Sequence, residues 1–217
     1  MKNKFLTILF GISVAIAILT FCIGLPIYCR FFYYLQISPL KIDSITGYSI
    51  QEIKIAYNEM LNYLVLPNKS FSAGVFSYTE NFALHMAAVK KLFTLNLVAF
   101  IISFTIIIVL LVLEKIKKIR LCKPFNLGVS FFSCLSLIST FIVIGVLCVI
   151  DSDKAFIIFH NIFFMGENWI FDPSTDPIIN VLPEQFFFNC GILILVSMII
   201  ICIIIIIYQL IKRKKLN

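Results

Sequence analysis

The sequence predicts an all-α polytopic membrane protein with four transmembrane helices and a small mixed α+β extracytoplasmic cap. The chain of 217 residues is 61% hydrophobic and only 13% charged, which is too apolar for a soluble domain. Four runs without a charged side chain each exceed the roughly 20 residues that cross a bilayer core as a helix. These runs are residues 5–29, 92–113, 125–150 and 186–210.

The charges that flank these runs predict their orientation. Of the 18 lysines and arginines, 11 precede the first run, separate the second from the third, or follow the fourth; Glu114 is the single acid among them. The positive-inside rule then places residues 114–124, the tail 211–217 and the N-terminus in the cytoplasm. Residues 30–91 and 151–185 become the extracytoplasmic cap. The net charge of +7 therefore indicates contact with anionic lipid headgroups, with no nucleic-acid partner.

The first run, residues 5–29, is expected to stay in the membrane as a span. Its basic beginning is similar to that of a signal peptide. However, its apolar stretch is longer than the hydrophobic region of such a peptide, and no A-x-A-like cleavage site follows it.

The first cap segment, residues 30–91, is predicted to combine extended chain with helix. Aromatic and β-branched residues at 31–42 indicate extended chain, and residues 69–78 around Gly74 indicate a turn or short hairpin. Ser49-Ile50-Gln51-Glu52 has the form of a capping box, and the helical pattern after it stops at Pro67. Thr79 is expected to cap a helix that continues into the second span.

The second cap segment, residues 151–185, is predicted to begin with an amphipathic helix. Asp151-Ser152-Asp153 is typical of a helix start, and the aromatic residues that follow recur on one face, as in a helix lying in the membrane interface. Met165-Gly166 is expected to end this helix, and 169–173 to form an aromatic-rich turn. Asp176-Pro177 predicts a further short helix, and Pro183-Glu184 the start of the fourth span.

The chain has two histidines, His85 and His160, and both fall in the predicted cap. Histidine is the side chain whose unperturbed pKa lies near neutrality, and large apolar neighbours can tune that pKa by desolvation. Two histidines at one water–lipid boundary suggest acid–base chemistry on a lipid-like substrate. The alternative is that both are interfacial residues that only satisfy local hydrogen bonds.

Other chemistries receive less support. The spacing of the acids that could join the histidines as metal ligands matches no zinc pattern. Several of these acids also suit turns and helix starts. No serine lies in a G-x-S-x-G elbow. The spans lack ionisable groups other than tyrosine and cysteine, which argues against ion-coupled transport. The acids in question are Glu80, Asp172, Asp176 and Glu184.

The two histidine blocks resemble those of the lipoprotein intramolecular transacylases of Gram-positive bacteria. The first block reads Glu80-x-x-x-x-His85-Met86-x-x-Val89-Lys90-x-Leu92-Phe93, with Ala88 where an acid is expected. The second reads His160-x-x-Phe163-Phe164, followed by Trp169-x-Phe171-x-Pro173-x-x-Asp176-x-Ile178-Ile179-x-x-Leu182-Pro183-Glu184. The four-span layout is similar too, so the likeness covers nearly the whole chain.

This resemblance implies a plasma-membrane acyltransferase that works without a cofactor or metal. It would move the sn-2 acyl chain of a diacylglyceryl lipoprotein to the α-amino group of the N-terminal cysteine, giving a lyso-form lipoprotein. We expect a monomer whose partners are this substrate and membrane lipid. The expected catalytic residues are His85 and His160. The expected substrate-contact residues are Tyr57, Glu80, Trp169, Phe171, Asp172 and Asp176.

Two functions of other classes stay open from the residues alone. One is a non-catalytic membrane scaffold or sensor with an outer ligand-binding cap. The other is a metal-dependent lipid hydrolase.

Overall fold

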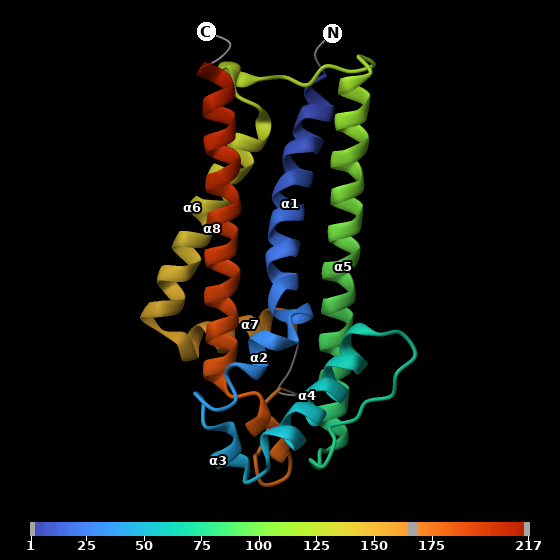
Figure 1. Cartoon of the computed structure of the whole chain (residues 1–217), viewed down its shortest axis with the longest axis vertical. Coiled ribbons are helices and arrows are strands. Elements are labelled where there is room, and N and C mark those ends of the chain that lie inside the picture. The colour runs from blue at the N-terminus through green and yellow to red at the C-terminus, as the bar shows by residue number, and fades with distance from the viewer. Residues whose placement is uncertain (1–2, 165–168, 215–217) are drawn as a thin grey trace. The chain divides into compact units, whose positions relative to one another are not determined.

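The computed structural model describes residues 3–164 and 169–214, and the regular elements in these ranges are all helical (Figure 1). Four of the helices are long and apolar enough to cross a membrane, α1, α5, α6 and α8. The predicted set of four membrane helices is therefore confirmed. In chain order the elements are α1 (Lys4–Tyr28), α2 (Arg30–Tyr34), α3 (Ile42–Thr46), α4 (Ile50–Val65), α5 (Glu80–Lys115), η1 (Pro124–Asn126), α6 (Val129–Ile150), α7 (Ser152–Phe163), η2 (Pro177–Val181) and α8 (Glu184–Lys214).

Helix α5 is longer than a bilayer crossing requires. Its uncharged run begins only at Leu92, so the residues Glu80–Lys91 precede the apolar span. At a rise of 1.5 Å per residue, this first part of α5 extends about 18 Å beyond the run. His85 therefore lies in the part of α5 that precedes its uncharged run.

Local capping explains where several helices begin. The Ser49 hydroxyl accepts a hydrogen bond from the Glu52 amide (3.3 Å), and the Glu52 carboxylate accepts one from the Ser49 amide (2.9 Å). This reciprocal pair is the predicted capping box of α4. The Thr79 hydroxyl accepts from the Phe82 amide (3.3 Å) at the start of α5. The Asp151 carboxylate accepts from the Lys154 amide (2.9 Å) at the start of α7, so all three predicted helix starts are confirmed.

The predicted mixed α+β cap is wrong, because no strand occurs in the described part of residues 30–91 and 151–185. The segment 31–42, expected to be extended, begins within α2 and continues as turns. Its Tyr33 is fully buried, and the Tyr33 hydroxyl donates a hydrogen bond to the carbonyl of Val181 (2.7 Å). Long-range packing of the aromatic residues therefore outweighs their preference for strands.

The segment 69–78 contains a turn at Gly74 and no strand, so only the hairpin part of that expectation fails. Gly74 has a φ of +59°, and a Cβ placed there would lie 3.1 Å from the Cα of Ala56. Glycine suits this close approach because it has no side chain.

The second cap segment follows the predicted order. Helix α7 is followed by η2, which starts directly after Asp176, and α8 starts directly after Pro183. The expected helix end at Met165-Gly166 lies outside the described residues.

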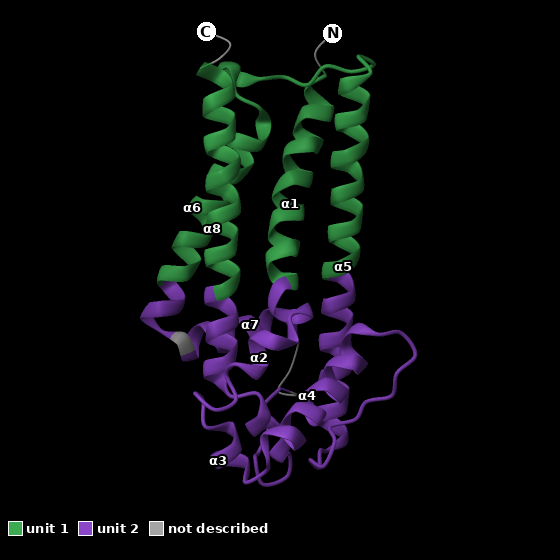
Figure 2. Cartoon of the chain, in the orientation of Figure 1, with its two compact units in different colours: residues 1–24, 96–146, 193–217 green, residues 25–95, 147–192 purple. Residues whose placement is uncertain are grey.

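The chain divides into two compact units (Figure 2). Unit 1 contains residues 1–24, 96–146 and 193–217, and unit 2 contains residues 25–95 and 147–192. Each unit has its own hydrophobic core. The unit 1 core includes Cys22, Cys134, Met198 and Cys202. The unit 2 core includes Tyr33, Ile53, Tyr57, Met60, Phe82, Ile178 and Val181. Both histidines belong to unit 2.

Candidate active site

His85 on α5 and His160 on α7 face each other within unit 2. Their ring centroids are 6.1 Å apart and the ring planes are within 20° of parallel. Each side chain is only 9% exposed. The two imidazoles therefore lie within reach of a single bound substrate molecule.

Aromatic rings surround this histidine pair. The His85 ring lies 4.5 Å from the ring of Phe164 and 5.4 Å from that of Phe171, measured between centroids. The His160 ring lies 4.0 Å from Phe156 and 4.7 Å from Trp169. The pair therefore lies in an apolar environment that lowers the local dielectric and suits an acyl chain.

Sequence reasoning did not single out Phe156 and Phe164 as site residues. A signal was nevertheless present, because Phe156, His160 and Phe164 recur at intervals of four residues. Side chains at this spacing lie on the same face of a helix, so a helix that continued through this stretch would have brought both rings toward the histidine; α7 ends at Phe163, and Phe164 follows as its C-cap.

A backbone hydrogen bond sets the tautomer of His160. Its Nδ1 lies 2.8 Å from the carbonyl oxygen of Phe156. A carbonyl can only accept, so Nδ1 carries the hydrogen in the neutral ring, and Nε2 keeps its lone pair. His160 therefore has the arrangement of a general base.

Burial favours the neutral form of both imidazoles. Burial first, and the neighbouring His160 second, lower the pKa of His85 to about 4. Burial also lowers the pKa of His160, although the hydrogen bond to Phe156 opposes this by favouring the charged ring. Both rings are consequently neutral at pH 7 and able to accept a proton.

Trp169 brings an unused donor to the site. Its indole nitrogen Nε1 is buried and has no hydrogen-bond partner among the described residues. A buried donor without a partner costs roughly 1–3 kcal/mol. Such a cost next to a histidine pair is expected where a ligand oxygen completes the bond.

Of the other residues expected to contact substrate, Phe171 lies at the site, whereas Tyr57 and Glu80 lie apart from the histidine rings. Tyr57 belongs to the unit 2 core, where its ring stacks on that of Tyr33 at 3.8 Å. Glu80 is exposed at the first residue of α5, more than one helical turn before His85.

The two aspartates make different backbone contacts. The buried Asp176 carboxylate accepts a hydrogen bond from the Thr79 amide (2.6 Å) and one from the Thr175 hydroxyl (3.0 Å). It thereby ties the segment before η2 to the start of α5. Asp172 is exposed, and its carboxylate accepts from the Ser174 amide (2.8 Å) in a local turn, which lowers the pKa of Asp172.

We expect Asp176→Ala to lower the stability of the folded chain by about 2 kcal/mol, because it leaves the half-buried Thr79 amide without its charged partner. The measurement is the thermal midpoint in detergent micelles. Asp172→Ala is the matched control, with a much smaller effect because its turn is exposed. Equal shifts in the two variants would contradict the prediction, and a raised KM without a change in midpoint would favour a substrate contact instead.

No group of three or more metal-ligating side chains in residues 3–164 and 169–214 is arranged to hold a metal ion.

The chain is similar in sequence and structure to known membrane transacylases. Residues 8–187 match the family model "Lipoprotein intramolecular transacylase Lit". The structure of membrane-integral Lit from Bacillus cereus is 25% identical, with a TM-score of 0.84 over 98% of this chain and 97% of that one.

Two structures of the same Bacillus cereus protein carry, in its own numbering, the mutations H85R and H85A. They are 23% and 24% identical, each with a TM-score of 0.79 over 98% of this chain, and cover 94% and 95% of the other. No curated protein sequence matches the chain. Since the family model spans most of its length, the chain belongs to the lipoprotein intramolecular transacylase family.

Proposed function

We propose that this membrane acyltransferase moves the sn-2 acyl chain of a diacylglyceryl lipoprotein to the α-amino group of its N-terminal cysteine, with His85 and His160 as the acid–base pair. The observation that supports these roles is the pair of buried imidazoles 6.1 Å apart between aromatic side chains. Neutral imidazoles among apolar aromatic side chains fit a reaction that joins an amine to a lipid ester.

The substrate itself reduces the barrier. The amine and the ester belong to one molecule, and holding them together can replace about 7–11 kcal/mol of activation free energy at best. A covalent acyl-enzyme intermediate is then unnecessary. The protein needs only to bind the acyl chains, orient the two groups and move protons.

His160 is the better base of the two. Its free Nε2 can take a proton from the α-amine, whose pKa in water is roughly 7.7–8.0, while Nδ1 stays bonded to Phe156. The amine nitrogen attacks the ester carbonyl carbon and forms the amide bond. The proton that the nitrogen loses to His160 is relayed to the neutral His85, which accepts it and passes it to the glyceryl oxygen as the ester bond breaks.

Trp169 supplies a donor for the negative charge that develops on the carbonyl oxygen. Its buried indole N–H lies on a ring 4.7 Å from His160 and has no partner in the described part of the chain. A preorganised donor in a water-poor site stabilises such an oxyanion strongly.

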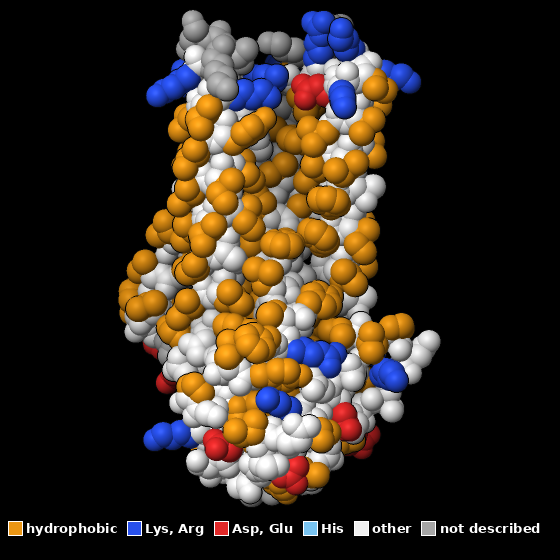
Figure 3. All heavy atoms as spheres, viewed as in Figure 1, with side chains coloured by type: hydrophobic (Ala, Val, Ile, Leu, Met, Phe, Trp, Pro, Cys, Tyr) orange, Lys and Arg blue, Asp and Glu red, His pale blue; other side chains and the backbone are white. Residues whose placement is uncertain are grey.

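We place the site at the extracytoplasmic face of the membrane, in a monomer. Figure 3 shows lysine and arginine side chains gathered at one end of unit 1. The positive-inside rule assigns that end to the cytoplasm. The helices α5 and α7 carry their histidines in the cap segments, which follow the first and third spans.

A reconstituted reaction tests the proposal. The full chain, in phosphatidylcholine vesicles, would receive a diacylated lipopeptide with different chains at sn-1 and sn-2. The product has the same mass as the substrate, so tandem mass spectrometry must locate the sn-2 chain on the amine. A mixture of isotopically labelled and unlabelled substrates should give no crossed product. Unchanged substrate, or exchange of chains between molecules, would contradict the proposal; an N-acetylated lipopeptide is the inert control.

Trp169→Phe is expected to lower kcat about 10²-fold with little change in KM, because it removes the N–H donor and keeps an aromatic ring. The measurement is the initial rate of lyso-form product over a range of lipopeptide concentrations. Ile170→Ala, a change at the neighbouring exposed side chain, is the control. An unaltered kcat in Trp169→Phe would remove the indole from the reaction and leave the histidine roles intact.

Stability should fall as the medium is acidified. Both histidines have a pKa below that of an exposed histidine, so the unfolded chain binds protons first as the pH drops. The stability from neutral His85 is complete above pH 6.5 and is lost as the pH falls toward about 4. From pH 7 to pH 5 its loss is on the order of 2 kcal/mol. The thermal midpoint in detergent should therefore drop less on acidification in His85→Asn than in the natural chain. Equal drops in the two proteins would contradict the prediction that protonation of His85 causes the loss of stability.

A further inference from the structure

A groove within unit 1 has no part in the proposed reaction. It has a volume of about 790 Å³ and is lined by residues of α1, α5, α6 and α8 and of the loop between α5 and α6. Its walls are largely apolar side chains of membrane helices. Lipid is the solvent of these helices, so an acyl chain is the natural occupant of such a groove.

The length of the groove matches one leaflet of a bilayer. Its apolar lining runs from Phe10 to Phe21 on α1 and from Phe100 to Leu111 on α5. Each of these stretches covers about 17 Å at 1.5 Å per residue. A bilayer hydrocarbon core of about 30 Å has leaflets of about 15 Å, so the groove accommodates an acyl chain of one leaflet.

The polar lining is concentrated where α8 meets the loop between α5 and α6. Lys123 and Lys212 line the groove there. The Gln209 side chain donates a hydrogen bond to the Ser130 hydroxyl (2.9 Å) and accepts one from the Gly128 amide (3.2 Å). This region therefore provides ammonium and hydroxyl groups beside an apolar channel, which is the pattern of a phospholipid headgroup and its chain.

The charge at this end favours an anionic headgroup. The one acid in the lining, Glu114 at the end of α5, accepts a hydrogen bond from the Leu121 amide (3.4 Å) of the loop that follows. Two lysines remain for a phosphate. The Lys212 ammonium lies 5.8 Å from the centre of the Tyr208 ring, which also lines the groove.

We propose that this groove is a binding site for an anionic phospholipid, with the acyl chain between the helices and the phosphate at Lys123 and Lys212. The residues that line this groove belong to unit 1, whereas His85 and His160 belong to unit 2. It holds a lipid of the leaflet at the basic end of unit 1, and this lipid is not a substrate of the transacylase.

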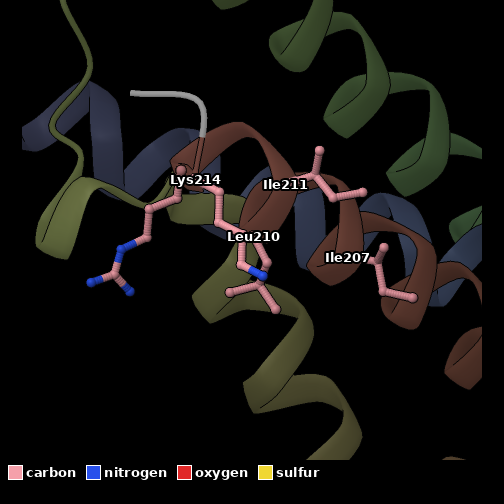
Figure 4. A pocket seen from close by; sticks show the side chains of 5 residues that line it. Ile207, Leu210, Ile211 and Lys214 are labelled. Atoms are coloured by element: carbon pink, nitrogen blue, oxygen red, sulfur yellow. The ribbon is translucent and has the colours of Figure 1, made fainter. Parts of the chain in front are cut away.

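A second recess at the same end serves as an internal comparison (Figure 4). It is lined by α8 alone, through Ile207, Leu210, Ile211, Arg213 and Lys214. One helix cannot enclose an acyl chain, although this recess offers the same number of basic side chains. Charge alone should therefore not produce binding there.

Native mass spectrometry of the full chain in detergent tests the site. The protein is mixed with equal amounts of phosphatidylglycerol and phosphatidylcholine that have identical acyl chains. Each lysine near a lipid surface contributes roughly 1 kcal/mol of attraction, or about a fivefold preference. The two lysines together correspond to about 25-fold, so we expect retained phosphatidylglycerol to exceed phosphatidylcholine by about that factor. The double variant K123Q/K212Q should lower this excess at least tenfold.

The matched control is R213Q/K214Q, which removes two charges from exposed side chains at the same end of α8. It should leave the preference unchanged. Equal retention of the two lipids by the natural chain would overturn the proposal, as would an equal loss of preference in both double variants. The four side chains that these variants replace are all exposed, so neither double variant is expected to disturb the fold.

Discussion

Replacing either histidine with alanine is expected to lower the rate of lyso-form lipoprotein formation by roughly 10²–10⁴-fold, the usual contribution of a positioned acid or base. His160→Ala removes the Nε2 that accepts the amine proton, and His85→Ala removes the facing ring 6.1 Å away. The measurement is the initial rate of transfer to the amine, located by tandem mass spectrometry. The double variant should be little worse than either single variant, because the two groups act as one unit.

A conservative change separates chemistry from packing. His160→Asn keeps a side-chain N–H near the position of Nδ1 and can still donate to the Phe156 carbonyl, but it has no basic nitrogen. It should therefore keep the thermal midpoint and lose activity as His160→Ala does. Activity near that of the natural chain in His160→Asn would refute the base assignment. Activity near that of the natural chain in His85→Ala, His160→Ala and His160→Asn would refute the histidine mechanism as a whole.

Phe82→Ala is expected to cost about 3–5 kcal/mol of stability, the range for removing a large buried aromatic side chain. The Phe82 ring is fully buried, with centroids 4.8 Å from the ring of Phe171 and 5.9 Å from that of Phe71. Because Phe171 in turn contacts His85, the cavity should also loosen the wall of the site and reduce kcat. The thermal midpoint in detergent and the transfer rate measure the two effects.

Leu84→Ala is the matched control for this change. Leu84 lies two residues further along α5 and is 57% exposed, so its loss should alter stability by no more than about 0.5 kcal/mol. If the two variants lost the same stability, the unit 2 core would not be the structure that holds the first turns of α5.

The features that the sequence predicted well depend on neighbours close in the chain. The capping box at Ser49 and the helix starts at Thr79 and Asp151 each involve an amide three residues away. The four spans follow from uninterrupted apolar runs, since a buried backbone in lipid must satisfy its hydrogen bonds internally. Such signals are readable without knowledge of the rest of the fold.

The features that the sequence predicted poorly depend on distant partners. The cap was expected to contain extended chain at residues 31–42, but the Tyr33 hydroxyl bonds to Val181, 148 residues away. The hydrogen bond that the Asp176 carboxylate accepts from the Thr79 amide, 97 residues away, was not predicted either. The Trp169 indole N–H, which has no hydrogen-bond partner among residues 3–164 and 169–214, likewise has no signature in the sequence.

The histidine site depends both on signals that are local in the sequence and on contacts between segments far apart in the chain. Apolar runs and flanking charges alone predicted that His85 and His160 lie in the two cap segments, because the cost of burying charge in lipid determines which segments cross the membrane. Only the tertiary structure decided that their rings lie 6.1 Å apart, that Phe156 sets the tautomer of His160, and that Tyr57 packs in the core. The physical reason is that hydropathy acts on whole segments, whereas the distance between two rings is determined by close packing between segments far apart in the chain.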